Sequence, residues 1–233
     1  MEALKNPDDK ILSYNDVVLR RSDLEILSGP HFLNDRVIEF YFSQLATRFP
    51  SNEEVLLVPP SIAFWIKECP DNNELLRDFL QPLNLHTRKL VIFPVNDNAD
   101  VELAGGGSHW SLLAFMRRRR CSGGRDVFVH HDSFGSHNRE HARRVYLAVR
   151  RYVVREEVAY VERPIEPGQT NGYDCGVYVA AVAEAICEWY HAGEGKEDDG
   201  IWFRELDEKV NQSRVSRMRG EILELMREMM AER

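Results

Sequence analysis

The sequence predicts an α+β domain with a mainly antiparallel central sheet that is flanked by helices. Three strand-like runs, at 88–96, 109–116 and 125–133, are rich in β-branched and aromatic residues and follow one another along the chain. Apolar residues at helical spacing lie both before and after these runs. No internal repeat and no linker rich in Pro, Gly or Ser divides the chain, so we expect a single domain over residues 1–233.

The part of the chain before the three strands is predicted to be mostly helical. Residues 32–49, FLNDRVIEFYFSQLATRF, carry apolar side chains at helical spacing, with Asn34 as the N-cap. Residues 55–61, VLLVPPS, predict a short strand that runs into a proline-started helix at 61–69. A second short helix is expected at 73–83.

The part after the three strands is predicted to alternate between helix and strand. Residues 137–154 form a helix, and residues 158–164 form a strand that prolines end. An apolar helix begins at Cys175. The acidic, glycine-containing residues 191–200 indicate a solvated loop, and a C-terminal helix at about 213–232 is expected to pack its apolar stripe on the domain.

Composition and charge exclude several classes of function. The chain has 233 residues, a formal net charge of −8 and a pI of about 5.5, which argues against nucleic acid as the main partner. No apolar run is long enough to span a bilayer, and the first ten residues are too charged for a secretory signal. We therefore expect a soluble cytoplasmic or nuclear protein, monomeric and without membrane partners.

Cys175 lies between Asp174 and Gly176, where a polar turn gives way to the apolar helix. Packing explains a cysteine at such a place, because free cysteine is among the most buried residue types. Catalysis also explains it, because a helix N-terminus lowers the pKa of a thiol and favours the reactive thiolate. The position of Cys175 by itself leaves both interpretations open.

A catalytic thiol needs a base, a group that orients this base, and donors for the oxyanion. His109 opens a strand after AGGG, although a lone histidine at a strand edge is also a common surface residue. Asp132 ends the next strand, at the same end of the sheet if the strands are neighbours, but it is equally a turn former. Gln169 lies six positions before Cys175 and can donate to an oxyanion beside the Cys175 N–H. Together these four residues fill each role once.

Three blocks resemble a known family: GGGSHWSLLAF at 105–115, HDSFGSHN at 131–138 and QTNGYDCGVYV at 169–179. They are similar to the His-Trp, Asp-Ser and Gln-x(5)-Cys-Gly blocks of the Ulp/sentrin-specific cysteine proteases. These enzymes cleave after the terminal Gly-Gly of ubiquitin-like modifiers. The resemblance extends from about residue 11 to residue 189, in consistent order, and it implies a papain-like cysteine protease domain.

Three further blocks, FLNDRVIEFYF at 32–42, FLQPLNL at 79–85 and VNDN at 95–98, are most similar to the deneddylase branch of this family. That branch is specific for the Rub modifier, or neddylin, attached to cullins. The resemblance therefore implies an isopeptidase that removes this modifier from lysines and trims its precursor. The same chemistry on SUMO or ubiquitin, and a non-catalytic module that only binds a modifier tail, are the alternatives.

The resemblance also assigns roles to individual residues. The catalytic triad falls on His109, Asp132 and Cys175, with Gln169 as the oxyanion donor, in agreement with the assignment from the residues themselves.

The family clamps the di-glycine tail between two aromatic residues. Trp110 matches one of them, and Phe32 stands where the family usually has tryptophan. Asp35 matches a residue that contacts the tail.

Other features are expected to play no part in the chemistry. The arginines at 117–120 and the adjacent Cys121 are interpreted as a solvated hairpin loop, and Cys69 and Cys187 as packing residues. The histidines at 130, 131, 137 and 141 lack a partner at ligand spacing, so we expect no metal site and no cofactor.

Overall fold

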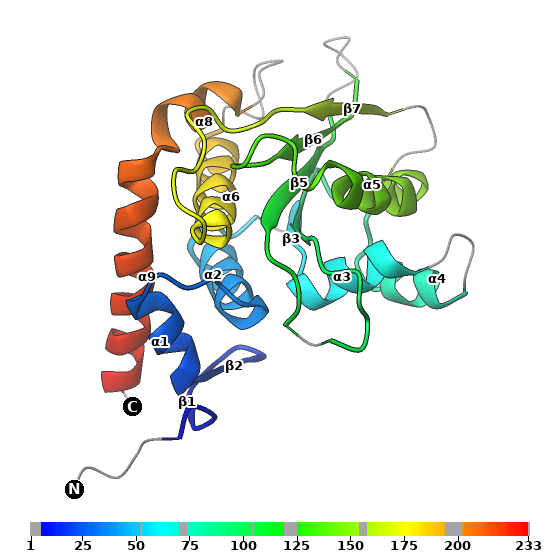
Figure 1. The fold of residues 1–233 in the computed structure, drawn as a ribbon. Coiled ribbons are helices and arrows are strands. Elements are labelled where there is room, and N and C mark those ends of the chain that lie inside the picture. The colour runs from blue at the N-terminus through cyan, green and yellow to red at the C-terminus, as the bar shows by residue number, and fades with distance from the viewer. Residues whose placement is uncertain are drawn as a thin grey trace, which may run out of the picture.

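The computed structural model describes residues 6–51, 53–69, 74–103, 105–118, 125–153, 158–193 and 202–232. Two predicted features, the end of the arginine run with Cys121 and most of the acidic loop at 191–200, lie outside the described residues. The centre of the molecule is a five-stranded sheet with the order β3-β4-β5-β6-β7 (Figure 1). Its strands are β3 (Val55–Leu57), β4 (Leu90–Asn96), β5 (Trp110–Met116), β6 (Val127–His131) and β7 (Ala159–Glu162).

The sheet is mixed, with antiparallel pairing at its centre and parallel pairing at its two edges. β5 pairs antiparallel with both β4 and β6, but β3 pairs parallel with β4 and β6 pairs parallel with β7. The reason lies in the connections, because a helical crossover between neighbouring strands makes them parallel. Helices α3 (Pro60–Glu68) and α4 (Glu74–Leu80) connect β3 to β4, and α5 (Arg139–Val153) connects β6 to β7. The predicted α+β class is confirmed.

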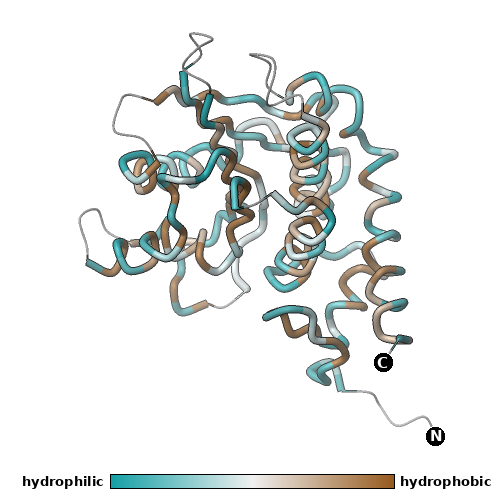
Figure 2. The backbone as a smooth tube through the Cα atoms, turned by 180° about the vertical axis from the view of Figure 1, so that it is seen from behind, coloured by the Kyte–Doolittle hydropathy of each residue, from teal (hydrophilic) through white to brown (hydrophobic). Residues whose placement is uncertain are grey.

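Helices cover both faces of the sheet. α2 (Asp35–Arg48) and α6 (Cys175–His191) pack on one face, and α3 and α5 pack on the other (Figure 1). All seven residues of β4 are buried, with Ile92 in the α2/α6 core and its neighbour Phe93 in the α3/α5 core. Figure 2 shows hydrophobic residues concentrated along the strands, with hydrophilic residues on the outer helices.

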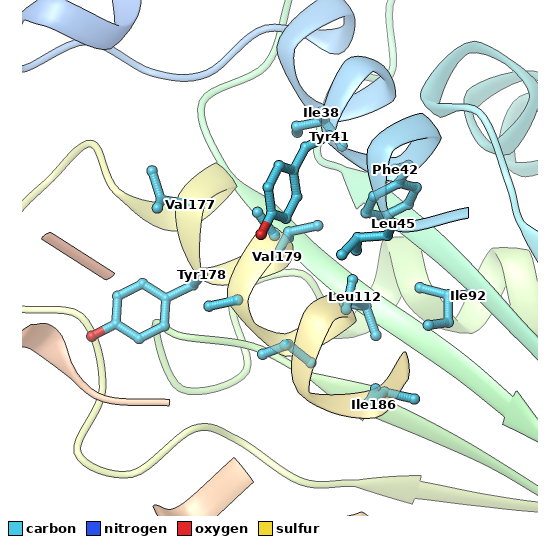
Figure 3. Packing of buried hydrophobic residues seen from close by; sticks show 14 of the residues in the cluster. Ile38, Tyr41, Phe42, Leu45, Ile92, Leu112, Val177, Tyr178, Val179 and Ile186 are labelled. Carbon is cyan, nitrogen blue, oxygen red and sulfur yellow. The ribbon is translucent and has the colours of Figure 1, made fainter. Parts of the chain in front are cut away.

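The core between α2, α6 and the sheet fixes where α6 lies. Figure 3 shows Leu45 of α2 and Ile186 of α6 beside Ile92 and Leu112 of the sheet. Fifteen residues of α6 are buried, so this helix is enclosed on nearly all sides. Because a helix held this way cannot shift without opening the core, its first residue has a well-defined position.

The two ends of the chain pack together outside the α2/α6 layer. A hairpin of β1 (Lys10–Tyr14) and β2 (Val17–Arg20) leads into α1 (Arg21–Ser28), and none of these three elements was predicted. The C-terminal part holds α8 (Phe203–Lys209), also not predicted, and α9 (Gln212–Ala231).

The predicted C-terminal helix is confirmed. α9 packs against α1 and α6 (Figure 1) and buries the stripe Val215, Met218, Ile222 and Met226.

Candidate active site

Cys175 is the first residue of α6 and is fully buried, with 0% of its surface exposed. The helix start packs directly on the segment that precedes α2, because a Cβ at Gly176 would lie 2.7 Å from the Cβ of Leu33. The turn before Cys175 is held by Asn171, whose side-chain oxygen accepts from the backbone N–H groups of Tyr173 and Asp174. Glycine at 176 and asparagine at 171 thus fix the position of the thiol.

His109 lies just before β5, at the edge of the sheet where the chain returns from the loop after β4. The carboxylate of Asp97 accepts from the backbone N–H groups of Ser108 (2.7 Å) and His109 (3.0 Å). Gly107 has φ +89°, and a Cβ there would lie 2.1 Å from the side-chain oxygen of Asn96. Glycine at position 107 therefore allows the segment before β5 to pack against Asn96 and Asp97, and this contact fixes the backbone of His109.

Asp132 follows β6 and accepts three hydrogen bonds. Its carboxylate accepts from Nε2 of His109 at 2.7 Å, and from the backbone N–H groups of Phe134 at 2.8 Å and Asn138 at 2.9 Å. Asn138 also donates through its side chain to the carbonyl oxygens of Val95 and His109. The predicted meeting of His109 and Asp132 at one end of the sheet is confirmed.

The Cys175 thiol interacts with His109, so the histidine ring lies between the thiol and the Asp132 carboxylate. Burial lowers the pKa of His109, but the hydrogen bonds to Asp132 and Cys175 outweigh it and raise the pKa to about 9. Burial raises the pKa of Asp132, but the hydrogen bonds from His109 and from the Asn138 backbone lower it further than burial raises it. The ring is therefore an imidazolium at neutral pH, and an adjacent cation favours the thiolate form of a cysteine.

Gln169 lies on the loop before α6 but does not bond to the other three residues. Its backbone N–H donates to the Ser133 carbonyl at 2.8 Å, and its side-chain oxygen accepts from the Ser133 hydroxyl at 3.0 Å. Its side-chain nitrogen donates to the carbonyl of Asn171 at 2.6 Å. Because an amide nitrogen carries two N–H groups, this bond leaves a second donor.

Comparison with known proteins identifies the family of this site. Residues 31–191 match the sequence profile described as the Ulp1 protease family, C-terminal catalytic domain. NEDD8-specific protease 1 of Arabidopsis thaliana is 51% identical over 225 residues, which cover 97% of this chain and 96% of that protein. The chain belongs to the Ulp1 protease family. It is a cysteine protease, as the sequence predicts.

Two further comparisons agree with this membership. Human sentrin-specific protease 8 is 35% identical over 185 residues, covering 78% of this chain and 82% of that protein. The X-ray structure of the C-terminal Ulp1 protease domain in complex with Smt3, the yeast ortholog of SUMO, superposes with a TM-score of 0.66 at 16% identity. That superposition covers 97% of this chain and 90% of the Ulp1 chain, so the fold is that of Ulp1-family proteases.

The three residues predicted to contact a modifier tail lie around the segment that leads into α2. Trp110 is only 5% exposed, and its indole N–H donates to the carbonyl of Leu33 at 2.9 Å. Phe32, the preceding residue of that segment, is 48% exposed. Asp35 begins α2, where burial raises its pKa against the opposing effects of a backbone hydrogen bond and Arg36. Of the two aromatic rings, the indole is thus buried and bonded to the Leu33 backbone, and the phenyl ring is open to solvent.

Sequence reasoning missed the residues that hold this Ulp1-family site in place. Asp97 lies in the VNDN block and Asn138 ends the HDSFGSHN block, so both were within quoted motifs but received no role. Arg219 of α9, which bonds to Asp174, lies in no motif. Among the described residues, no cluster of three or more His, Cys, Asp or Glu side chains has the arrangement needed for a metal ion. No described helix is long and apolar enough to cross a membrane.

Proposed function

We propose that this protein is a thiol protease and isopeptidase that cleaves after the terminal Gly-Gly of NEDD8, the Rub-type modifier named in its relatives. It releases the modifier from lysines of target proteins such as cullins and trims the modifier's precursor. The observation that carries the chemistry is the His109 ring, which bonds to Asp132 through Nε2 and interacts with the Cys175 thiol. The name of the Arabidopsis thaliana relative, NEDD8-specific protease 1, supports the choice of modifier.

In the first half of the reaction, the Cys175 thiolate attacks the carbonyl carbon of the last glycine. The Asp132 carboxylate holds Nε2 of His109, which leaves Nδ1 for the thiol. The tetrahedral intermediate collapses as the C–N bond breaks, and the imidazolium gives its proton to the leaving lysine amine. The product of this half is a thioester between Cys175 and the modifier, with His109 neutral.

In the second half, water hydrolyses the thioester. The neutral His109 ring takes a proton from the water, whose oxygen attacks the thioester carbonyl. The C–S bond breaks, the modifier leaves with a free carboxyl group that gives its proton to solvent, and the thiolate–imidazolium pair is restored. Asp132 keeps its charge throughout and stabilises the imidazolium. No cofactor takes part in either half.

The oxyanion of both intermediates needs donors near the start of α6. The Cys175 backbone N–H lies at the N-terminus of α6, where the helix dipole favours negative charge. Gln169 supplies the second donor from its side-chain nitrogen. It uses either the N–H that does not bond to the Asn171 carbonyl, or the bonded N–H after the amide rotates away from this carbonyl. Its backbone is anchored to Ser133, one residue after Asp132, so only the amide group has to move.

The tail of the modifier is proposed to pass between Trp110 and Phe32, beside the Leu33 backbone. Only glycine leaves room for both aromatic rings, which explains the Gly-Gly requirement. Asp35 is half-buried and its charged form is disfavoured by burial, so a cationic residue of the tail is its natural partner. We further propose a monomer in the cytoplasm or nucleus, where the thiol stays reduced.

Cleavage of three modifier precursors by the purified protein tests this function. We expect the NEDD8 precursor to be cleaved after Gly-Gly, ubiquitin more slowly and SUMO hardly at all, with Cys175→Ala inactive on all three. Because NEDD8 and ubiquitin tails differ little, a few contacts of about 1–3 kcal/mol each must separate them. Faster cleavage of SUMO would contradict the choice of modifier. Binding without cleavage of any precursor would mean a non-catalytic tail-binding module.

A further inference from the structure

Arg219 of α9 has a mostly buried side chain, 11% exposed, that reaches two segments far away in sequence. It lies outside residues 31–191, the part of the chain that matches the family. Its guanidinium donates to one carboxylate, that of Asp174, and to backbone carbonyls on both segments. These bonds join Nε to Asp174 (2.9 Å), Nη1 to Ile26 (3.0 Å) and Gly29 (3.3 Å), and Nη2 to His31 (3.0 Å) and Tyr173 (3.3 Å).

The two segments are the two sides of the proposed tail site. Residues 26–31 run directly into Phe32 and Leu33, and Leu33 is bonded to Trp110. Residues 173–174 run directly into Cys175, the proposed nucleophile. Arg219 also places its guanidinium 5.4 Å from the centre of the Tyr173 ring. One planar group with five donors therefore spans the gap between the tail segment and the nucleophile turn.

We propose that Arg219 is a positioning residue, which sets the distance between the tail-binding segment and the Cys175 thiol. This inference rests on the proposed function, because it takes Cys175 as the nucleophile and Phe32 and Leu33 as part of the tail site. A second residue of α9, Gln212, supports this inference, because it contacts the loop before Cys175 near the loop's other end. Gln212 accepts hydrogen bonds from the Thr170 hydroxyl at 3.0 Å and the Tyr178 hydroxyl at 3.3 Å, so α9 holds the loop next to Gln169 as well.

Loss of Arg219 is expected to act on the substrate's position and not on the thiol's own reactivity. The His109–Asp132 pair is held by Asp97 and Asn138, and Arg219 contacts none of these residues. Without the guanidinium, the carbonyls of Gly29 and His31 lose their donor, and the two segments can separate. The scissile carbonyl then lies out of reach of the thiolate for most of the time, and a misplacement of about 1 Å costs on the order of 100-fold in rate.

Arg214 offers a matched control on the same helix. Its side chain forms ion pairs with Glu184 of α6 at 2.6 Å and with Glu221 of α9 at 2.6 Å. It therefore also ties α9 to α6, but its partners lie away from the nucleophile turn and the tail segment. A role that is only structural would be disturbed by changes at either arginine.

The experiment compares Arg219→Gln and Arg219→Lys with Arg214→Gln and the unmodified protein. Lysine keeps a positive charge next to Asp174, so we expect Arg219→Lys to fold even if Arg219→Gln does not. Because lysine cannot reach all five acceptors, this variant still tests the role of the guanidinium. Two rates of modification at Cys175 are measured by mass spectrometry. One uses NEDD8 whose C-terminal carboxylate is replaced by an electrophile, and the other uses iodoacetamide, which needs no tail site.

We expect Arg219→Gln to slow labelling by the NEDD8 electrophile roughly 10- to 100-fold. Arg219→Lys should lie between this variant and the unmodified protein. Iodoacetamide should react with Cys175 at a rate within about twofold of normal in both variants, and Arg214→Gln should leave both rates within about twofold. Equal losses with both reagents, or equal effects of the two glutamine variants, would overturn the proposal. If the unmodified protein itself is not labelled by the NEDD8 electrophile, the proposed function fails instead.

Discussion

The two ends of helix α6 each carry a buried cysteine, but their surroundings differ completely. Cys175, at the first residue, is 0% exposed and interacts with His109. Cys187, twelve positions later, is 3% exposed and faces Glu184 and Glu188. Burial and these two carboxylates raise the pKa of Cys187 to about 12. Its thiol is therefore fully protonated and inert at neutral pH.

Burial therefore does not distinguish the proposed nucleophile from a packing residue. Both thiols are enclosed by the same core, so the distinction comes from the charge of the nearest polar group. A cationic imidazole favours the thiolate, whereas carboxylates disfavour it. The end of the helix matters as well, because the dipole is positive at the N-terminus, where Cys175 lies, and negative near Cys187.

The sharpest way to break this comparison is to remove each thiol in turn. Cys175→Ala should lower kcat/KM for a NEDD8 substrate by roughly 1,000-fold or more, because no other group can take the nucleophile's place. Cys187→Ala should leave kcat/KM unchanged while lowering the free energy of unfolding by about 1 kcal/mol. Turnover and thermal unfolding of both variants check this. An inactive Cys187→Ala, fully folded, would refute the assignment.

The next largest effect is expected at Asp132. Asp132→Asn removes the charge that holds Nε2 of His109 and favours the wrong tautomer of the ring. We expect kcat to fall by about 100- to 10,000-fold, with KM for the modifier nearly unchanged, because the tail site is not touched. Steady-state kinetics measure both constants. A variant with normal kcat would show that the hydrogen bond to His109 has no catalytic role.

The pH dependence tests the imidazolium directly. Because the pKa of His109 is raised from 6.5 to about 9, the ring keeps its proton between these two values in the folded protein. Folding therefore gains stability from this proton below pH 6.5 and loses it as the pH rises through about 9. We expect kcat/KM to decline through about pH 9 for the same reason, since the general acid is lost. A decline of kcat/KM centred near pH 6.5 would mean that the pKa of His109 is not raised, and it would contradict the presence of an imidazolium at neutral pH.

The smallest expected effect is at the tail site. Phe32→Trp restores the aromatic residue usual in the family at an exposed position, so the fold has room for the larger ring. We expect a lower KM for NEDD8 substrates, by up to about tenfold, with kcat unchanged. The matched variant Phe134→Trp enlarges another exposed ring near His109 and should not lower KM. A large loss of activity in Phe32→Trp would show that the pocket around Phe32 differs in shape from that of the family, so the family's clamp would not apply at this position.

Sequence reasoning could place the proposed catalytic residues because each one lies at the end of a regular element. His109 precedes a strand, Asp132 follows one and Cys175 starts a helix, so local patterns fix their place along the chain. The order of strands then brings the first two to the same end of the sheet. The orientation of Gln169 could not be predicted, because it depends on bonds to Asn171 and Ser133 that no local pattern reveals.

Other parts of the structure could not be predicted from the sequence, for different reasons. Arg219 bonds to Asp174 across 45 residues, and most of its partners are backbone carbonyls, which every residue has. The hairpin of β1 and β2 is short. Its turn is marked by the positive φ of 49° at Asn15, which is a property of the backbone and not of the residue pattern. The parallel edges of the sheet, by contrast, were predictable, because helices were already expected between the strands concerned.

The most direct test of the account is to find which thiol reacts with a modifier-tail electrophile. NEDD8 carrying such an electrophile is added to the reduced, folded protein, and the modified cysteine is located by mass spectrometry of peptides. We predict rapid modification at Cys175, none at Cys187 or the half-buried Cys69, and almost none with the SUMO equivalent. Modification at Cys187, or a faster reaction with SUMO than with NEDD8, would contradict the account.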